Sequence, residues 1–142
     1  MIYFLDSSVL VKRYCAEPGS TTVRGLFRRQ REIAVARITY AEVASAIARQ
    51  AREGLLTIPT RDAIVERLRR DLEALTVVEV RPALVERAGG LVLAWPLRAY
   101  DAVQLAAALT LQTAGLTVDF WCSDRRLLEA AAGSGLRATL VR

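Results

Sequence analysis

The segment Ile2-Tyr3-Phe4-Leu5-Asp6-Ser7-Ser8 carries the pattern on which the fold prediction rests. A short apolar run is followed at once by three polar residues, which is typical of a buried strand that leads into a helix N-terminus. The same succession of strand and helix recurs along the chain. Further strands are predicted at residues 33–36, 76–80, 118–122 and 136–141.

The segments between these strands have the patterns of helices. We expect helices at residues 9–14, 20–29, 40–52, 60–73, 82–93, 100–113 and 125–132. Ser20, Thr39 and Thr60 are the predicted caps of three of them, and Glu42 could form a capping box with Thr39. Strands that alternate with helices indicate βαβ units and a parallel sheet covered on both faces. The sequence therefore predicts one α/β domain over residues 1–142.

Composition narrows the class of protein. The chain has 142 residues, of which 53% are hydrophobic and 25% are charged, so it can bury a stable core without disulfides. We expect a cytoplasmic protein, because neither a signal peptide nor an apolar run of membrane-spanning length is visible. Cys15 and Cys122 are expected to be free, buried thiols, and a disulfide between them is the alternative.

The charged residues point to a class of partner and exclude several mechanisms. A formal net charge of +5 makes a polyanion such as nucleic acid a candidate ligand. The chain contains no histidine, which excludes catalysis by Ser–His or Cys–His pairs. Any catalysis must therefore depend on carboxylates, a metal ion, lysine or hydroxyl groups.

Four acidic residues fall where an open parallel sheet places its ligand sites, beyond the carboxyl ends of the strands. Asp6 and Asp124 follow the first and fourth predicted strands, and Glu42 and Asp101 lie in the first turns of two helices. Carboxylates held together repel one another, and the oxygen-preferring cations Mg²⁺ and Mn²⁺ would balance them. Such an ion can activate water and stabilise charge on a phosphate, so the pattern indicates phosphodiester hydrolysis.

Each of these residues also has a purely structural interpretation. Asp6 and Asp124 could only cap helices, Glu42 could only complete a capping box, and Asp101 could only favour a helix dipole. Capping is a poor explanation for all four lying at one edge of the sheet. Asp119, in contrast, is expected to point to solvent, with a place near the site as the alternative.

The same residues resemble the motifs of PIN-domain proteins of the VapC toxin type. The matching stretches are Tyr3–Lys12 with Glu17–Ser20, Thr39–Val43, Leu97–Ala108, and Ser123–Ala131 followed by Gly135–Leu136. The likeness extends over essentially the whole chain, in the right order. Val103-Gln104 and Trp121 depart from the usual pattern, and we expect neither to touch the acidic residues.

This resemblance implies a three-layer α/β/α sandwich with a five-stranded parallel sheet, and a ribonuclease that depends on Mg²⁺ or Mn²⁺. The implied catalytic residues and metal ligands are Asp6, Glu42, Asp101 and Asp124, supported by the polar side chains of Ser7, Thr39 and Ser123. The resemblance also implies a homodimer, and a toxin that inhibits translation or growth until an antitoxin covers its site.

Surface contacts are harder to predict. The basic residues near the site in sequence, which could contact RNA phosphates, are Lys12, Arg13, Arg37, Arg98, Arg125 and Arg126. Trp95 and Trp121 are assigned to packing rather than to base stacking. The apolar residues that could receive an antitoxin, with ordinary core packing as the alternative, are Val43, Ala44, Ile47, Leu55 and Leu56.

Three other functions compete with this interpretation. A phosphatase with Asp6 as nucleophile would need a second acid where Ser8 stands, and a later lysine, but none follows Lys12. A catalytically inactive module that binds RNA or protein would not need the complete acidic set. A free-standing RNA-processing nuclease would keep the chemistry and lack an antitoxin.

Overall fold

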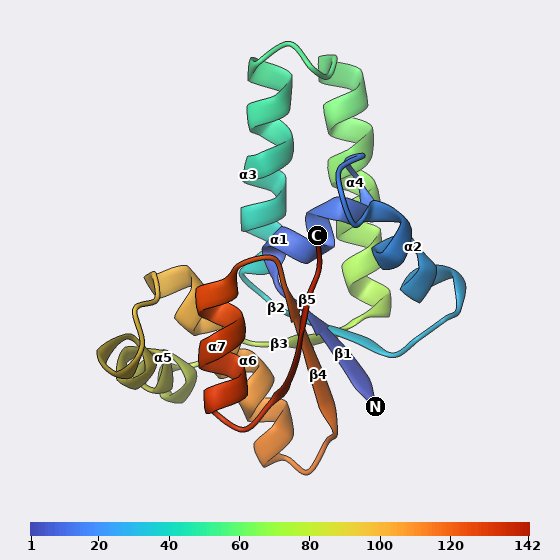
Figure 1. The fold of residues 1–142 in the computed structure, drawn as a ribbon. Coiled ribbons are helices and arrows are strands. Elements are labelled where there is room, and N and C mark those ends of the chain that lie inside the picture. Colours follow the sequence, from blue (N-terminus) through green and yellow to red (C-terminus); the bar gives the residue numbers. More distant parts are fainter.

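Five short strands form one parallel sheet in the computed structural model, which describes residues 1–142 (Figure 1). The strands are β1 (Ile2–Leu5), β2 (Ile33–Ala36), β3 (Thr76–Val78), β4 (Val118–Cys122) and β5 (Arg137–Leu140). The helices are α1 (Ser7–Leu10), the 3-10 turn η1 (Val11–Arg13), α2 (Ser20–Arg28), α3 (Thr39–Arg52), α4 (Ile58–Ala74), α5 (Pro82–Ala94), α6 (Ala99–Thr113) and α7 (Arg125–Gly133). The predicted α/β fold is confirmed, although β3 and β5 are shorter than expected.

The strand order places segments from the two ends of the sequence side by side. The order is β3-β2-β1-β4-β5, and every neighbouring pair is parallel. The chain moves outward from β1 to β3 and then returns to the other side of β1 for β4 and β5. The connections that leave β1 and β4 therefore diverge, and the crevice at such a reversal is the usual ligand site of an open α/β sheet.

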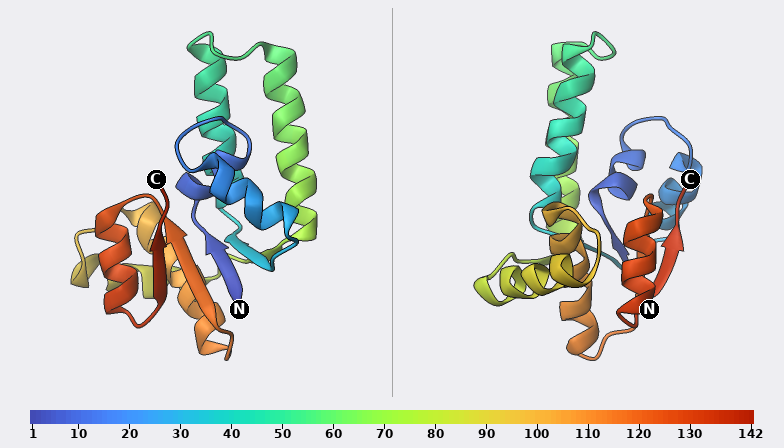
Figure 2. Two further views of the ribbon diagram at one scale, coloured as in Figure 1. Left: turned by 45° about the vertical axis from the view of Figure 1, so that its right-hand side comes forward. Right: turned by 60° about the vertical axis from the view of Figure 1, so that its left-hand side comes forward.

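Helices cover both faces of the sheet (Figure 2). On one face, α1 to α4 enclose a core that includes Leu5 and Val35. On the other, α5 to α7 pack around Phe4 and Phe120, whose rings stack with 5.6 Å between their centroids. Successive strand residues point to opposite faces, so Phe4 and Leu5 belong to separate cores. The result is the predicted three-layer sandwich.

Two helices begin differently from the prediction. Gly19, not Ser20, is the N-cap of α2, and its φ of 91° lies in the left-handed region that glycine adopts without a Cβ clash. The Ser20 hydroxyl instead donates to the carbonyl of Cys15. Thr57, not Thr60, caps α4, and its side-chain oxygen accepts the N–H of Thr60.

The two cysteines are buried and free, as predicted. Cys15 lies in the core beneath α1 to α4, and Cys122 lies in the core on the opposite face of the sheet. The alternative of a disulfide is therefore wrong.

Helices α3 and α4 form a hairpin that extends past the carboxyl edge of the sheet (Figures 1 and 2). Leu55, at the tip of this hairpin, is 68% exposed. No helix of the structure combines the length and the apolar character needed to cross a membrane.

Candidate active site

Asp6 is buried at the carboxyl end of β1, where the order of the strands reverses. Its Oδ1 accepts the backbone N–H of Val9 at 3.0 Å and the Ser8 hydroxyl at 2.6 Å. The predicted cap of α1 is therefore confirmed. Neither bond engages Oδ2, so capping leaves the second carboxylate oxygen available as a ligand.

Glu42 belongs to a network that joins α1, α3 and α6. Its Oε1 accepts the hydroxyl of Ser7 at 2.8 Å and the side-chain Nε2 of Gln104 at 2.8 Å. Nε2 also lies 2.8 Å from the Ser7 oxygen and 2.9 Å from Oγ1 of Thr39. The predicted capping box is wrong, because α3 starts after Ile38 without a side-chain cap and both Thr39 and Glu42 face Gln104 instead.

Gln104 is the principal site residue that the sequence interpretation missed. It is 2% exposed, and its Oε1 has no hydrogen-bond partner. A carboxylate only accepts hydrogen bonds, so the amide must turn its N–H groups toward Glu42 and leave its oxygen unpaired. The expectation that this position lies away from the acidic residues is wrong. The departure of Gln104 from the usual family motif was the feature of the sequence that could have pointed to a role in the site.

Asp101 and Asp124 line a second part of the site. A hollow of about 450 Å³ is bounded by Pro96, Leu97, Arg98, Asp101, Asp124 and Arg126. Asp124 caps α7, since its Oδ1 accepts the N–H of Arg126 at 2.8 Å. Arg98 approaches Asp101 with 3.3 Å between Nε and Oδ2, and its side chain is 80% exposed. Two carboxylates and two arginines thus share one opening.

The acidic groups are close enough to influence one another. Burial raises the pKa of Asp6 from 3.8 to about 7, and the charges of Asp101 and Glu42 add to this effect, although the hydrogen bonds from Ser8 and Val9 oppose it. Burial, with the neighbouring Asp6, also raises the pKa of the Cys122 thiol to about 12. The site therefore disfavours additional negative charge and would favour a cation.

The side chains fit a hard divalent cation in their chemistry. Every candidate ligand is a carboxylate oxygen, and the buried Oγ of Ser123 has no hydrogen-bond partner. No group of three or more acidic or cysteine side chains is arranged to hold an ion in this structure. Mg²⁺ is usually bound through one or two carboxylates and keeps several waters. It therefore does not need a site in which every ligand comes from the protein, and a few carboxylates suffice.

The predicted RNA-contacting residues divide into two groups. Lys12 is wrong as a phosphate contact, because it is buried and its ammonium donates to Glu17 and to the Pro18 carbonyl. Arg13 stays a prediction: its guanidinium lies 3.7 Å from the centre of the Phe27 ring and its Nε donates to Asp71, while the side chain also lines a surface hollow with Arg24 and other basic residues.

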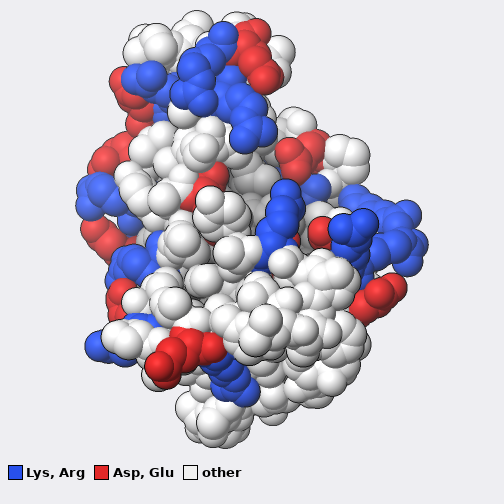
Figure 3. Space-filling model, turned by 90° about the vertical axis from the view of Figure 1, so that its left-hand side faces the viewer, with Lys and Arg blue, Asp and Glu red and all other residues white.

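The remaining basic side chains are exposed. Arg98 and Arg126 line the hollow with Asp101 and Asp124. Arg125 is exposed but is not part of that lining. Arg37 is exposed and paired with Glu79. On the face seen in Figure 3, basic groups lie on either side of a central region that contains acidic atoms and is hollowed.

Several other predictions concern packing. Trp121 is buried and Trp95 packs against the core, as expected. Asp119 does not point to solvent: it is 3% exposed and accepts the Thr139 hydroxyl at 2.9 Å. This buried bond holds β4 to β5.

The predicted antitoxin surface needs revision. Val43 and Ile47 are fully buried in the core, so they cannot receive a partner.

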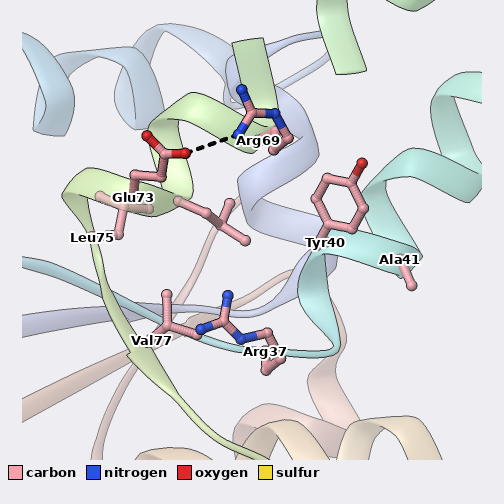
Figure 4. Close-up of a pocket in the computed structure, with 8 residues that line it drawn as sticks. Arg37, Tyr40, Ala41, Arg69, Glu73, Leu75 and Val77 are labelled. Carbon is pink, nitrogen blue, oxygen red and sulfur yellow. Dashed lines mark hydrogen bonds and ion pairs between the residues drawn. The ribbon is translucent and has the colours of Figure 1, made fainter. Parts of the chain in front are cut away.

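The largest hollow, about 720 Å³, lies beside the edge strand β3, and its lining residues are Arg37, Tyr40, Ala41, Arg69, Leu72, Glu73, Leu75 and Val77 (Figure 4). The paired side chains of Arg69 and Glu73 lie at one side of it, and most of the lining is apolar.

Comparison with known proteins agrees with this architecture. The PIN domain family matches residues 3–121. Ribonuclease VapC45 of Mycobacterium tuberculosis (strain CDC 1551 / Oshkosh) is 38% identical over 138 residues, which covers 96% of this chain and 93% of that protein.

Solved structures share the fold at lower identity. VapBC2 from Rickettsia felis, bound to a DNA fragment from its promoter, aligns over the whole of both chains with a TM-score of 0.69 and 14% identity. Mycobacterium tuberculosis VapC20, a sarcin-ricin loop cleaving toxin, aligns with a TM-score of 0.65 and 14% identity over 94% of this chain and 95% of that one.

The fold and the site define an α/β sandwich with acidic side chains at the edge of the sheet where the strand order reverses. The chain belongs to the PIN-domain family and is similar to its VapC-type members.

Proposed function

We propose that this chain, as a single PIN domain of residues 1–142, is a Mg²⁺- or Mn²⁺-dependent endoribonuclease and the toxin of a toxin–antitoxin pair. The observation that carries the proposal is that the charges of Glu42 and Asp101 act on the buried Asp6, and that Asp101 shares an opening with Asp124 and two exposed arginines. The 38% identity to a protein named ribonuclease VapC45 supports the reaction type.

The metal would be held by carboxylates from among Asp6, Glu42, Asp101 and Asp124. When bound, such an ion supplies an activated water and stabilises the charge that develops on a phosphate. Ser7 and Gln104 orient Glu42 through the hydrogen bonds already described. Ser123 offers a buried hydroxyl beside the site, and a carboxylate of the set that is not neutralised would accept the proton of the attacking water.

The arginines would bind the substrate rather than perform chemistry. Arg98 and Arg126 share an opening with Asp101 and Asp124, so a phosphate that enters it meets both charges. Guanidinium groups bind phosphate oxygens in a fixed, forked geometry, which would hold the RNA backbone against the crevice.

Three apolar regions of the surface support the proposed protein partners. Val85 and Leu93 on α5 are 51% and 90% exposed, and an apolar helix face of this kind suits a homodimer. The apolar hollow beside β3 and the hairpin tip at Leu55 remain available to an antitoxin. A toxin-antitoxin complex from Klebsiella pneumoniae has the same fold, and this likeness supports an antitoxin as partner.

The deciding experiment incubates the purified chain with total RNA in Mg²⁺ or Mn²⁺. EDTA and an Asp101→Asn variant serve as parallel controls. Discrete fragments that disappear in both controls are the expected result. Absence of cleavage in either metal, from folded and antitoxin-free protein, would instead favour an inactive binding module. Cleavage that survives both controls would place the activity outside this site.

A further inference from the structure

A second hollow opens on the Glu42 side of the acidic crevice. Its volume is about 410 Å³, and its lining residues are Ile38, Ala41, Glu42, Ser45, Arg49 and Tyr100. It contains none of the residues of the Arg98–Arg126 opening, yet Tyr100 directly precedes Asp101. Each hollow is thus lined by part of the acidic set, this one by Glu42 and the other by Asp101 and Asp124.

The second hollow differs in chemistry from the first. Ile38 and Ala41 make part of its lining apolar, and the large ring of Tyr100 is 61% exposed. An exposed aromatic ring offers a flat apolar face on which a base can stack. The first hollow, in contrast, is lined mainly by charged residues, which suits a phosphate.

Polar groups border this apolar surface. Glu42, Ser45 and Arg49 lie three and four residues apart on α3, so they share one helix face. Arg49 and Ser45 are exposed, and neither side chain makes a hydrogen bond or ion pair within the chain. A hydroxyl and a guanidinium thus remain free to contact the edge of a ligand whose flat face lies on Tyr100.

We propose that this hollow is a nucleobase-binding subsite, in which Tyr100 stacks on a base next to the cleaved phosphate. Arg49 contacts the same nucleotide, through its base edge or its phosphate. The inference rests on the proposed ribonuclease function and adds an element to it. Stacking on an aromatic ring accepts every base and contributes strongly to the binding of single-stranded RNA. The substrate is accordingly a segment whose bases are unpaired at the cleavage point.

The test measures binding of a short, mixed-sequence, fluorescein-labelled single-stranded RNA by polarisation. All proteins carry Asp101→Asn, so that the probe is not cut. Tyr100→Leu, which removes the ring, should bind about 5- to 150-fold more weakly. Tyr100→Phe keeps the ring and should bind like the parent. Leu116→Ala changes an exposed residue in the connection before β4 and should also have no effect.

A second probe separates stacking from general surface effects. With an abasic ribose-phosphate strand, Tyr100→Leu should bind as tightly as the parent, because there is no base to stack on the ring. If Arg49 contacts a phosphate, Arg49→Gln should still reduce the salt dependence of binding to this strand. Equal loss with both probes, or no loss with either, would overturn the subsite. A change in sedimentation without a change in RNA affinity would also overturn it, because the ring would then belong to a protein interface.

Failure of the subsite is distinguishable from failure of the proposed function. If Tyr100→Leu in the otherwise native chain cleaves RNA with the KM of the parent, the subsite is refuted and the nuclease stands. If the parent neither binds nor cleaves RNA, the proposed function fails first.

Discussion

Replacing Asp6 by asparagine should stabilise the metal-free protein at high pH. Asp6 is buried, and its pKa of about 7 lies above the ordinary 3.8 because burial penalises the charged form. A carboxyl whose pKa is raised by folding adds stability below its unfolded pKa, and this contribution is lost as the pH rises through the folded pKa. The metal-free native chain should therefore be less stable at pH 8 than at pH 5.

The size of the effect follows from the two pKa values. A gap of about three between them corresponds to about 4 kcal/mol at pH 8, since each pKa unit represents about 1.4 kcal/mol. An asparagine carries no charge, but its oxygen accepts the Ser8 and Val9 hydrogen bonds more weakly than a carboxylate. The expected gain for Asp6→Asn at pH 8 is accordingly about 2 to 4 kcal/mol.

Urea unfolding in EDTA at pH 5 and pH 8 measures this directly. Asp62→Asn is the matched control, because that carboxyl is 63% exposed and should show no comparable pH-dependent gain. Addition of Mg²⁺ at pH 8 should stabilise the native chain and have little effect on Asp6→Asn. An Asp6→Asn protein that is equally destabilised at both pH values would refute the electrostatic argument and leave only capping.

The remaining predictions concern single contacts. Gln104→Leu should lower kcat about tenfold with little change in KM, because Glu42 loses the amide that orients it. Steady-state cleavage kinetics would show this. An effect on KM alone would contradict it. Gly133→Ala should cost about 1 to 3 kcal/mol in thermal unfolding, because a Cβ there meets the Trp95 ring, and an unchanged Tm would show that the ring can move. Arg126→Gln should lower the slope of log affinity against log salt by about one in RNA binding, and an unchanged slope would exclude a phosphate contact.

Local patterns predicted most of the fold. The apolar runs before Asp6 and before Ser123 identify two strands and their order along the chain, because strand formation and turn chemistry depend on neighbouring residues. The caps at Asp6 and Asp124 could be anticipated, because each side chain accepts a backbone N–H two or three residues further along the chain. The type of chemistry could also be predicted, because the four candidate acidic residues and the absence of histidine restrict the mechanisms that the chain can support.

The roles of individual polar side chains could not be predicted from local patterns. Thr39 and Glu42 have the spacing of a capping box, yet both contact Gln104, which lies 65 and 62 residues further along the chain. Lys12 is a charged residue of the kind that usually lies on the surface, yet it is buried and forms an ion pair with Glu17. A hydrogen-bond partner of this kind is chosen by packing, because a buried polar group must bond to whatever lies nearest.

The sequence by itself determined the alternation of strands and helices, and the position of an acid after β1 and after β4. Only the tertiary structure decided that β1 and β4 are neighbours, which places those two acids at the carboxyl ends of adjacent strands. Strand order depends on contacts between residues more than a hundred positions apart, such as Phe4 with Phe120, and no local pattern encodes these contacts. The site is therefore a property of the folded sheet, although each of its ligands is visible in the chain.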